Sequence, residues 1–135
     1  MRPQFHIILG LVFIIILKFF ASFTSMQLLI IFASSVLIDV DHWFIYSLKK
    51  KDISVLRAYK WFVALEESNK KIKFLFIFHT IEFFLLICFL SFYYNFIYYS
   101  LIGISFHYIC DFIRDFKEKY SRKNFSIIDY FLTKK

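Results

Sequence analysis

Three of the four histidines in this 135-residue chain stand three or four positions from an acidic residue. The pairs are Asp39 and His42, His79 and Glu82, and His107 and Asp111. On a helix, this spacing places both side chains on one face. Imidazole and carboxylate together are ligands of transition metals, and such ions activate water for hydrolysis. The spacing therefore indicates metal chemistry built on helices.

The segments that carry these pairs are strongly apolar. The chain is 60% hydrophobic and 24% aromatic, with only two glycines and one proline. A membrane span needs about 20 mostly apolar residues, and four segments meet this condition: about 5–23, 26–46, 73–93 and 95–114. We therefore predict an all-α protein, an integral membrane four-helix bundle of four transmembrane helices that forms one domain, residues 1–135.

The first apolar segment also resembles a signal peptide, since Arg2 precedes it and small residues follow it at 21–25. Its apolar run is longer than the usual 7–15 residues of a signal peptide, and Lys18 lies inside it. We therefore interpret it as a span.

The basic residues predict the topology. The net charge is +7, and most lysines and arginines fall in the segment 47–72 and the tail 115–135. Positively charged loops stay in the cytoplasm. We therefore expect the loop, the tail and both termini to lie in the cytoplasm. The protein itself is expected in the inner (cytoplasmic) membrane of a cell. Membrane lipids are the expected partners. No nucleic-acid partner is expected, because the charge lies in short loops.

The central loop has a helical pattern of its own. Its apolar residues recur at helical spacing, at Val55, Leu56, Tyr59, Phe62 and Val63. Arg57 and Lys60 lie off this stripe. The pattern predicts a cytoplasmic amphipathic helix between the second and third spans, resting on the inner leaflet. A solvated linker is the alternative.

With this topology, the ionisable residues of all four spans lie at a similar depth. At 1.5 Å per residue they fall roughly 5–13 Å below the inner interface. Ionisable groups in a membrane span indicate function. The predicted metal ligands are the four histidines and three of the acids: His6, Asp39, His42, His79, Glu82, His107 and Asp111. Asp41 is a fourth acid beside them.

The role of Asp41 has two interpretations. On a regular helix it does not share the face of Asp39, so either the helix loosens there or Asp41 orients a histidine. A carboxylate that binds no metal could serve as general base, and Asp41 and Glu82 are the candidates. Cys110 could also be a ligand, although packing is the simpler interpretation. The whole set could instead be hydrogen-bonded pairs that join helices.

The order of these motifs is similar to that of the YdjM-like membrane-bound metal-dependent hydrolases. The matching segments are Phe5–Gly10, Ile38–His42, His79–Glu82 and His107–Asp111, and in this order they extend over roughly residues 6–111, which is most of the chain. Two features depart from the family: Ile38 stands where Pro is usual, and a longer His-Arg…Thr-His-Ser element is absent, with Glu82 present instead. The resemblance implies a metal-dependent hydrolase and no particular substrate.

These observations together predict a membrane-embedded hydrolase with one or two divalent transition metal ions, Zn, Mn or Fe. Because the site lies near the inner leaflet, we expect a small molecule or a lipid as substrate, and first of all a lipid ester or phosphodiester. A small di-iron membrane oxidase is one alternative, since carboxylate-rich bundles bind iron. A non-catalytic metal-binding or transport protein is the other.

Overall fold

The computed structural model describes residues 3–67, 74–118 and 126–132. Within these ranges every regular element is a helix, so the all-α prediction is confirmed. The elements are α1 (Pro3–Phe20), α2 (Ser25–Leu37), α3 (Val40–Lys50), α4 (Val55–Glu67), the 3-10 helix η1 (Ile77–His79), α5 (Ile81–Ser91), α6 (Asn95–Glu118) and α7 (Ile127–Leu132).

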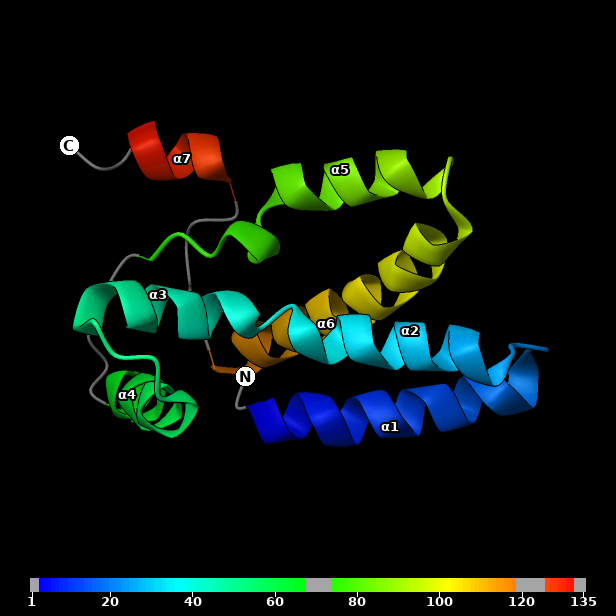
Figure 1. The fold of residues 1–135 in the computed structure, drawn as a ribbon, viewed down its shortest axis with the longest axis horizontal. Helices are drawn as coiled ribbons and strands as arrows, with labels where there is room; N and C mark the ends of the chain where they lie inside the picture. The colour runs from blue at the N-terminus through cyan, green and yellow to red at the C-terminus, as the bar shows by residue number, and fades with distance from the viewer. Residues whose placement is uncertain (1–2, 68–73, 119–125, 133–135) are drawn as a thin grey trace.

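The long helices form two hairpins whose short connections lie at the same end of the molecule (Figure 1). One connection joins α1 to α2 and the other joins α5 to α6. The start of α1 lies toward the opposite end, where α3, α4 and α7 are found. At the hairpin end, Thr24 caps α2 in a capping box with Gln27, whose amide donates to the Tyr99 hydroxyl of α6 at 2.6 Å.

Two helical segments are long and apolar enough to cross a membrane by length and composition: Ser25–Lys50, which joins α2 to α3, and Asn95–Phe116 within α6. The apolar helices Gln4–Phe20 and Ile81–Ser91 are shorter. At 1.5 Å per residue, the 11 residues of α5 cover about 16 Å of the roughly 30 Å apolar layer. The structure therefore supports two of the four expected spans by length.

The expected third span, 73–93, is not one helix. Residues 74–76 precede η1, and Thr80 has an extended backbone (φ −94°, ψ 153°) before α5 begins. The Thr80 hydroxyl donates to the Ile77 carbonyl at 2.8 Å and accepts from the Phe83 amide at 3.3 Å. This double role of Thr80 ends η1 and caps α5, which is why the helix is interrupted.

Helix α2 lies between α1 and α6, and the only two glycines of the chain stand at its two contacts. A Cβ added at Gly103 of α6 would lie 2.1 Å from the Ile31 carbonyl oxygen and 2.2 Å from the Ser34 hydroxyl. One added at Gly10 of α1 would lie 3.0 Å from the Ser35 hydroxyl. Glycine thus allows the backbones of α2 and α6 to touch, as small residues do in membrane bundles.

Replacing Gly103 with alanine should destabilise the fold by about 1–3 kcal/mol, because the new methyl overlaps backbone atoms that cannot rotate away. Thermal unfolding in detergent measures the effect. Gly10→Ala is the matched control and should cost less, since its nearest neighbour is a side-chain hydroxyl. Adding Ser34→Ala to Gly103→Ala should not restore stability, because the Ile31 carbonyl remains. Equal stability of the two glycine variants would contradict this account.

The helix loosens between α2 and α3. Ile38 and Asp39 form a turn, and Asp39 has ψ 0° in place of the usual helical value near −42°. The Asp39 amide bonds the Val36 carbonyl at 3.4 Å, a separation of three residues. Because the helix changes register at this turn, the side chains that follow Asp39 point in other directions than they would on a continuous helix.

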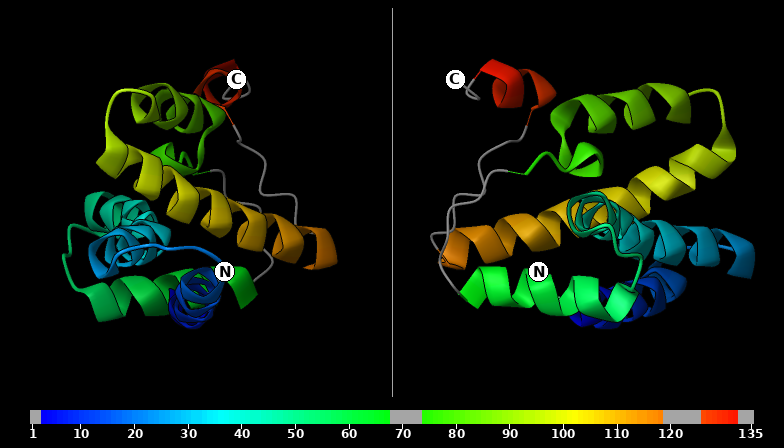
Figure 2. Two further views of the ribbon diagram at one scale, coloured as in Figure 1. Left: turned by 90° about the vertical axis from the view of Figure 1, so that its right-hand side faces the viewer. Right: turned by 60° about the vertical axis from the view of Figure 1, so that its left-hand side comes forward.

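Helix α4 packs across the same end of the bundle, near the start of α1 (Figure 2). The Gln4 amide of α1 donates to the Tyr59 hydroxyl of α4 at 3.1 Å. The predicted apolar stripe is divided: Phe62 contacts Phe76 of the bundle, whereas Val55 and Leu56 are exposed. The expected helix of the central loop is therefore present, and part of its apolar surface packs inside the protein.

A polar corner joins α3 to α4. The Asp52 carboxylate accepts from Arg57 Nε at 2.6 Å and Nη2 at 2.7 Å, and from the Tyr46 hydroxyl. The Arg57 guanidinium, followed by the Tyr46 hydroxyl, holds the pKa of Asp52 well below its usual range. The corner thus stabilises the fold above the ordinary carboxyl pKa of about 3.9 and loses that effect as pH falls through the lowered value.

Acidification should therefore release α4 in the wild type only below about pH 4. Asp52→Asn should release it at neutral pH, because the substituted amide cannot form the ion pair. Fluorescence of Trp61, which lies 5.7 Å from the Tyr46 ring, reports the change. An identical acid transition in wild type and variant would show that the ion pair does not hold the corner.

Candidate metal centre

The side chains inside the bundle are unusually polar. The buried polar set comprises His6, Ser35, Asp41, Thr80, His107 and Arg114. Many large apolar side chains face outward instead, including Phe19 and Phe20 on α1 and Phe112 on α6. The four histidines lie close to Asp39, Asp41 and Asp111 in this polar interior. Four separate segments contribute: the start of α1, the α2–α3 junction, η1 and the middle of α6.

His107 is held by the backbone of α2. Its side chain is fully buried, and its Nδ1 lies 2.8 Å from the Ser35 carbonyl oxygen. Because a carbonyl only accepts, Nδ1 carries the proton. The Nε2 atom of neutral His107 therefore keeps its lone pair for a ligand.

His79 is held in the same way by Asp41. Its Nδ1 lies 3.0 Å from Asp41 Oδ2, which also accepts from the Phe78 amide at 3.2 Å. The ionised carboxylate places the proton on Nδ1 and leaves Nε2 as an acceptor. A carboxylate behind a histidine is the usual way to orient a metal ligand.

The two Nε2 atoms face each other. They lie 3.2 Å apart. Because each Nδ1 faces an acceptor and carries the proton of its ring, each Nε2 has a lone pair. Two lone pairs at this separation repel, so the contact requires a positive charge beside it. Either an extra proton or a metal ion supplies that charge.

Two carboxylates complete the surroundings of this pair. Asp39 Oδ1 lies 3.4 Å from His79 Nε2 and 3.6 Å from His107 Nε2. Asp111 Oδ2 lies 3.8 Å and 3.6 Å from the same two atoms. Ligands bound at about 2.1 Å in a tetrahedral zinc site are about 3.4 Å apart. Atoms at these separations could therefore hold a metal ion between them.

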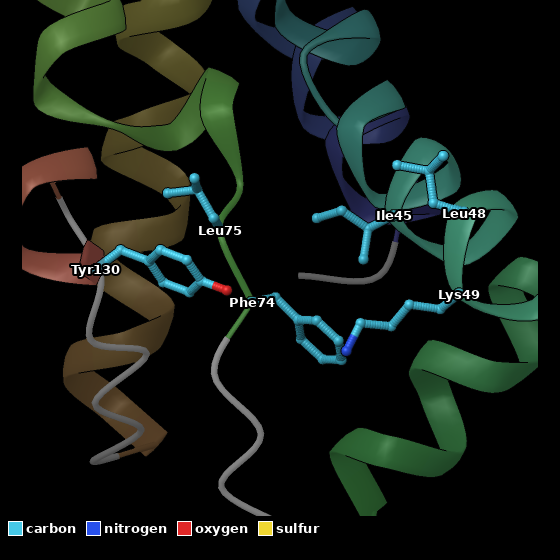
Figure 3. A pocket seen from close by; sticks show the side chains of 6 residues that line it. All are labelled: Ile45, Leu48, Lys49, Phe74, Leu75 and Tyr130. Atoms are coloured by element: carbon cyan, nitrogen blue, oxygen red, sulfur yellow. The ribbon is translucent and has the colours of Figure 1, made fainter. Parts of the chain in front are cut away.

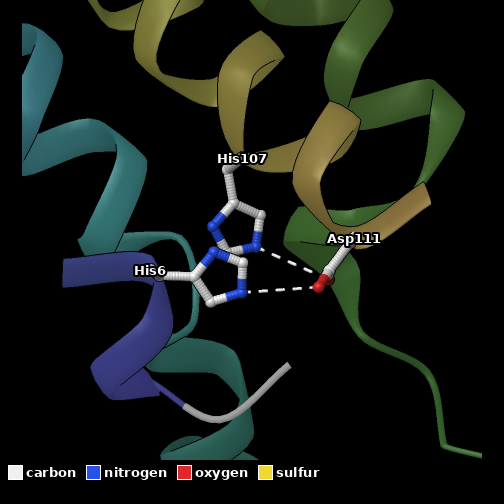
Figure 4. Close-up of side chains that lie close together, drawn as sticks. All are labelled: His6, His107 and Asp111. Carbon is white, nitrogen blue, oxygen red and sulfur yellow. Dashed lines mark ion pairs between the residues drawn. The ribbon is translucent and has the colours of Figure 1, made fainter. Parts of the chain in front are cut away.

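His6 lies beside His107 and approaches the second oxygen of each carboxylate. Its Nε2 is 3.4 Å from Asp111 Oδ1 and 3.7 Å from Asp39 Oδ2, the oxygens that do not face His79. Its ring stacks on that of His107 at 3.8 Å between centroids (Figure 4). His6 Nε2 and Asp39 Oδ2 are buried and make no hydrogen bond within the described part of the chain. Such buried atoms cost about 1–3 kcal/mol each unless a ligand binds them.

Asp41 and His42 act differently from the other predicted ligands. His42 Nδ1 lies 2.8 Å from Asp41 Oδ1, a hydrogen-bond distance that leaves no space for an ion between the two atoms. Its ring also stacks on Phe76 at 4.1 Å. Asp41 therefore accepts bonds from two imidazoles. The helix does loosen at Ile38–Asp39, but the contacts of Asp41 favour the interpretation that it orients a histidine.

Glu82 does not join the cluster, which corrects the expectation that it shares a face with His79. The extended backbone of Thr80 separates η1 from α5, so helical spacing does not apply across it. The Glu82 carboxylate instead accepts from the Ser126 hydroxyl and from the Ile127 amide at 3.0 Å. It tethers the start of α7, and neither a ligand role nor a general-base role follows from this position.

Three residues that the sequence analysis did not select shape the site. The Ser35 carbonyl orients His107, and the Tyr108 hydroxyl donates to the Phe78 carbonyl beside His79. Arg114, at the end of the expected fourth span, is buried, with Nη1 3.9 Å from Asp111 Oδ1. The three-residue spacing of Asp111 and Arg114 could have indicated this contact. No sequence signal indicates the other two, since one uses a backbone atom and both join distant segments.

Comparison of the chain with models of protein families, with curated proteins and with solved structures found no match. The resemblance to membrane-bound metal-dependent hydrolases therefore remains a prediction. Several His and Asp groups of this chain could hold a metal ion: His6, His107 and Asp111; Asp39, His79 and His107; and Asp41, His42 and His79. The geometry favours the first two groups, because the third is closed by hydrogen bonds.

Metal analysis of purified protein tests these assignments. His79→Ala should lower the amount of bound transition metal, because it removes an Nε2 ligand. Asp41→Asn should weaken binding about 10–100-fold, the usual cost of losing a group that orients a ligand. Elemental analysis and competition with a metal indicator measure both.

Glu82→Gln is the control and should retain the metal of the wild type. If Glu82→Gln lost as much metal as His79→Ala, the site would have to include α5. If Asp41→Asn bound metal as tightly as the wild type, the orienting role of Asp41 would be wrong.

Proposed function

We propose that this protein is a membrane-embedded, metal-dependent hydrolase. The outward apolar surface supports a membrane location: exposed patches larger than a few hundred Å² mark contact with lipid or partners. The positive segments then place both termini and α4 in the cytoplasm. A bundle with two long helical segments and two shorter ones, α1 and α5, is compatible with this location if the shorter ones only partly cross the membrane.

The observation that carries the metal centre is the arrangement around Asp39 and Asp111. One oxygen of each carboxylate faces His79 and His107, and the other faces His6. Carboxylates with this arrangement can bridge two ions. The first ion would have His79, His107 and the two carboxylates as ligands. The second would have His6 and the same carboxylates, and three protein ligands leave coordination positions for water and substrate.

A metal ion held by these residues would lower the pKa of a bound water and polarise a carbonyl or phosphoryl oxygen. The protein's own side chains supply the rest. Asp41 and the Ser35 carbonyl fix the tautomers of His79 and His107. Arg114 pairs with Asp115 at 2.6 Å and directs its Nη1 toward Asp111 at 3.9 Å. A lipid ester or phosphodiester is the substrate class that fits a site beneath the head groups of the inner leaflet. Zn, Mn or Fe suits the ligand set.

Detergent-solubilised protein loaded with Zn, Mn or Fe should hydrolyse a phospholipid ester or phosphodiester, and a chelator should remove the activity reversibly. His6→Ala should lower turnover at least about 100-fold while one metal equivalent remains bound. The readouts are product release and elemental analysis on the same samples.

Two other outcomes would overturn the proposal. Bound iron with visible charge-transfer absorption and no hydrolysis would favour the di-iron oxidase. Full metal loading without turnover on either substrate class would favour a metal-binding or transport protein.

A further inference from the structure

A second concave site lies at the end of the bundle where α3 and α7 approach residues 74–75. It is a pocket of about 250 Å³ (Figure 3). The side chains that line it are Ile45, Leu48, Lys49, Phe74, Leu75 and Tyr130. Five of the six are apolar or aromatic, and the sixth is a cation. This composition selects a ligand with an apolar body and a negative group.

The pocket is distinct from the metal centre and close to it. None of its lining residues is a predicted metal ligand. Phe74 contacts Phe76 at 5.9 Å between ring centroids, and Phe76 stacks on His42. Two aromatic rings therefore separate the pocket from the hydrogen-bonded pair of Asp41 and His42.

The size of the pocket and the exposure of the residues around it indicate what kind of ligand it binds. Most small-molecule sites enclose about 300–1,000 Å³, so this pocket holds only part of a larger molecule. Its lining is open on the α3 side, where Leu48 is 66% exposed. Helix α7, which contributes Tyr130, also exposes Phe131 and Leu132 at 65% and 73%. A ligand that enters here continues along apolar surface, as an acyl chain does and a soluble metabolite does not.

The charge on the pocket wall belongs to Lys49. Its Nζ lies 4.5 Å from the centre of the Phe74 ring, so the cation is held at the pocket by a π face. Lys50 and Lys51 follow directly on the chain. A cluster of basic residues at the cytoplasmic end of a membrane helix attracts anionic head groups.

The opposite wall depends on Glu82. Its carboxylate tethers Ser126 and the Ile127 amide at the start of α7, which carries Tyr130 into the pocket. An acid that was expected at the metal centre thus shapes the neighbouring pocket.

We propose that this pocket binds one anionic phospholipid of the inner leaflet, with an acyl chain against Ile45, Phe74 and Leu75 and the phosphate at Lys49. The inference rests on the proposed membrane location and not on hydrolysis. It assigns a lipid site beside the metal centre, at the end of the bundle that carries the basic segments.

Native mass spectrometry of the detergent-purified protein, treated with chelator, tests the site without any metal chemistry. Titration with phosphatidylglycerol and with phosphatidylcholine of the same chains should give one tight adduct with the anionic lipid. Lys49→Gln should weaken it about fivefold, the loss of about 1 kcal/mol expected for one lysine near an anionic head group. Lys50→Gln is the matched control, since Lys50 lies 5.8 Å from the Trp61 ring and outside the pocket lining.

A second pair of variants tests the apolar part. Leu48→Trp should fill the pocket and abolish the tight adduct, whereas Leu56→Trp, on the exposed part of α4, should not. Circular dichroism confirms that each variant is folded. Equal weakening by the two lysine variants would indicate a diffuse surface effect and overturn the site. Tight binding that survives Leu48→Trp would do the same. Either result would leave the metal analysis unaffected.

Discussion

The structure depends on neutralising carboxylates inside an apolar bundle. Asp39, Asp41 and Asp111 are buried or nearly so, and a buried charge without a partner is costly. Asp41 is satisfied by hydrogen bonds from His42, His79 and the Phe78 amide. Asp39 and Asp111 instead lie 3.4–3.8 Å from the Nε2 atoms of His6, His79 and His107, with His42 Nδ1 also near Asp39 and Arg114 near Asp111. This difference between the three acids separates Asp41, which orients histidines, from Asp39 and Asp111, which could hold a metal ion.

That arrangement needs helices that approach very closely. Gly103 lets the backbone of α6 touch α2 at Ile31 and Ser34, and His107 lies one turn further along α6. The same close approach brings His107 Nδ1 to the Ser35 carbonyl of α2. If α2 and α6 were further apart, the Ser35 carbonyl would no longer fix the orientation of the His107 ring or the position of its proton. The packing of two glycines against one central helix is therefore linked directly to the chemistry of the site.

The interruption at Thr80 gives the two polar residues beside it separate tasks. His79 in η1 turns toward Asp41 and the interior, and Glu82 in α5 turns toward α7. One segment thus supports both the metal centre and the wall of the pocket between α3 and α7. The chain is short, and its few polar residues each contribute to an assembly of several helices.

The sequence by itself determined the helical class and most members of the cluster, because hydrophobic runs and the rarity of acids inside them are local facts. The pairing of His107 with Asp111 followed from regular helical spacing within α6. Spacing misled at Glu82, where an extended residue breaks the helix, and it left the role of Asp41 open. Only the tertiary structure decided which atoms meet, since the Ser35 carbonyl, the Asp41 carboxylate and the two faces of Asp39 act on residues far away in the chain. Such contacts depend on how closely helices pack, which no local pattern encodes.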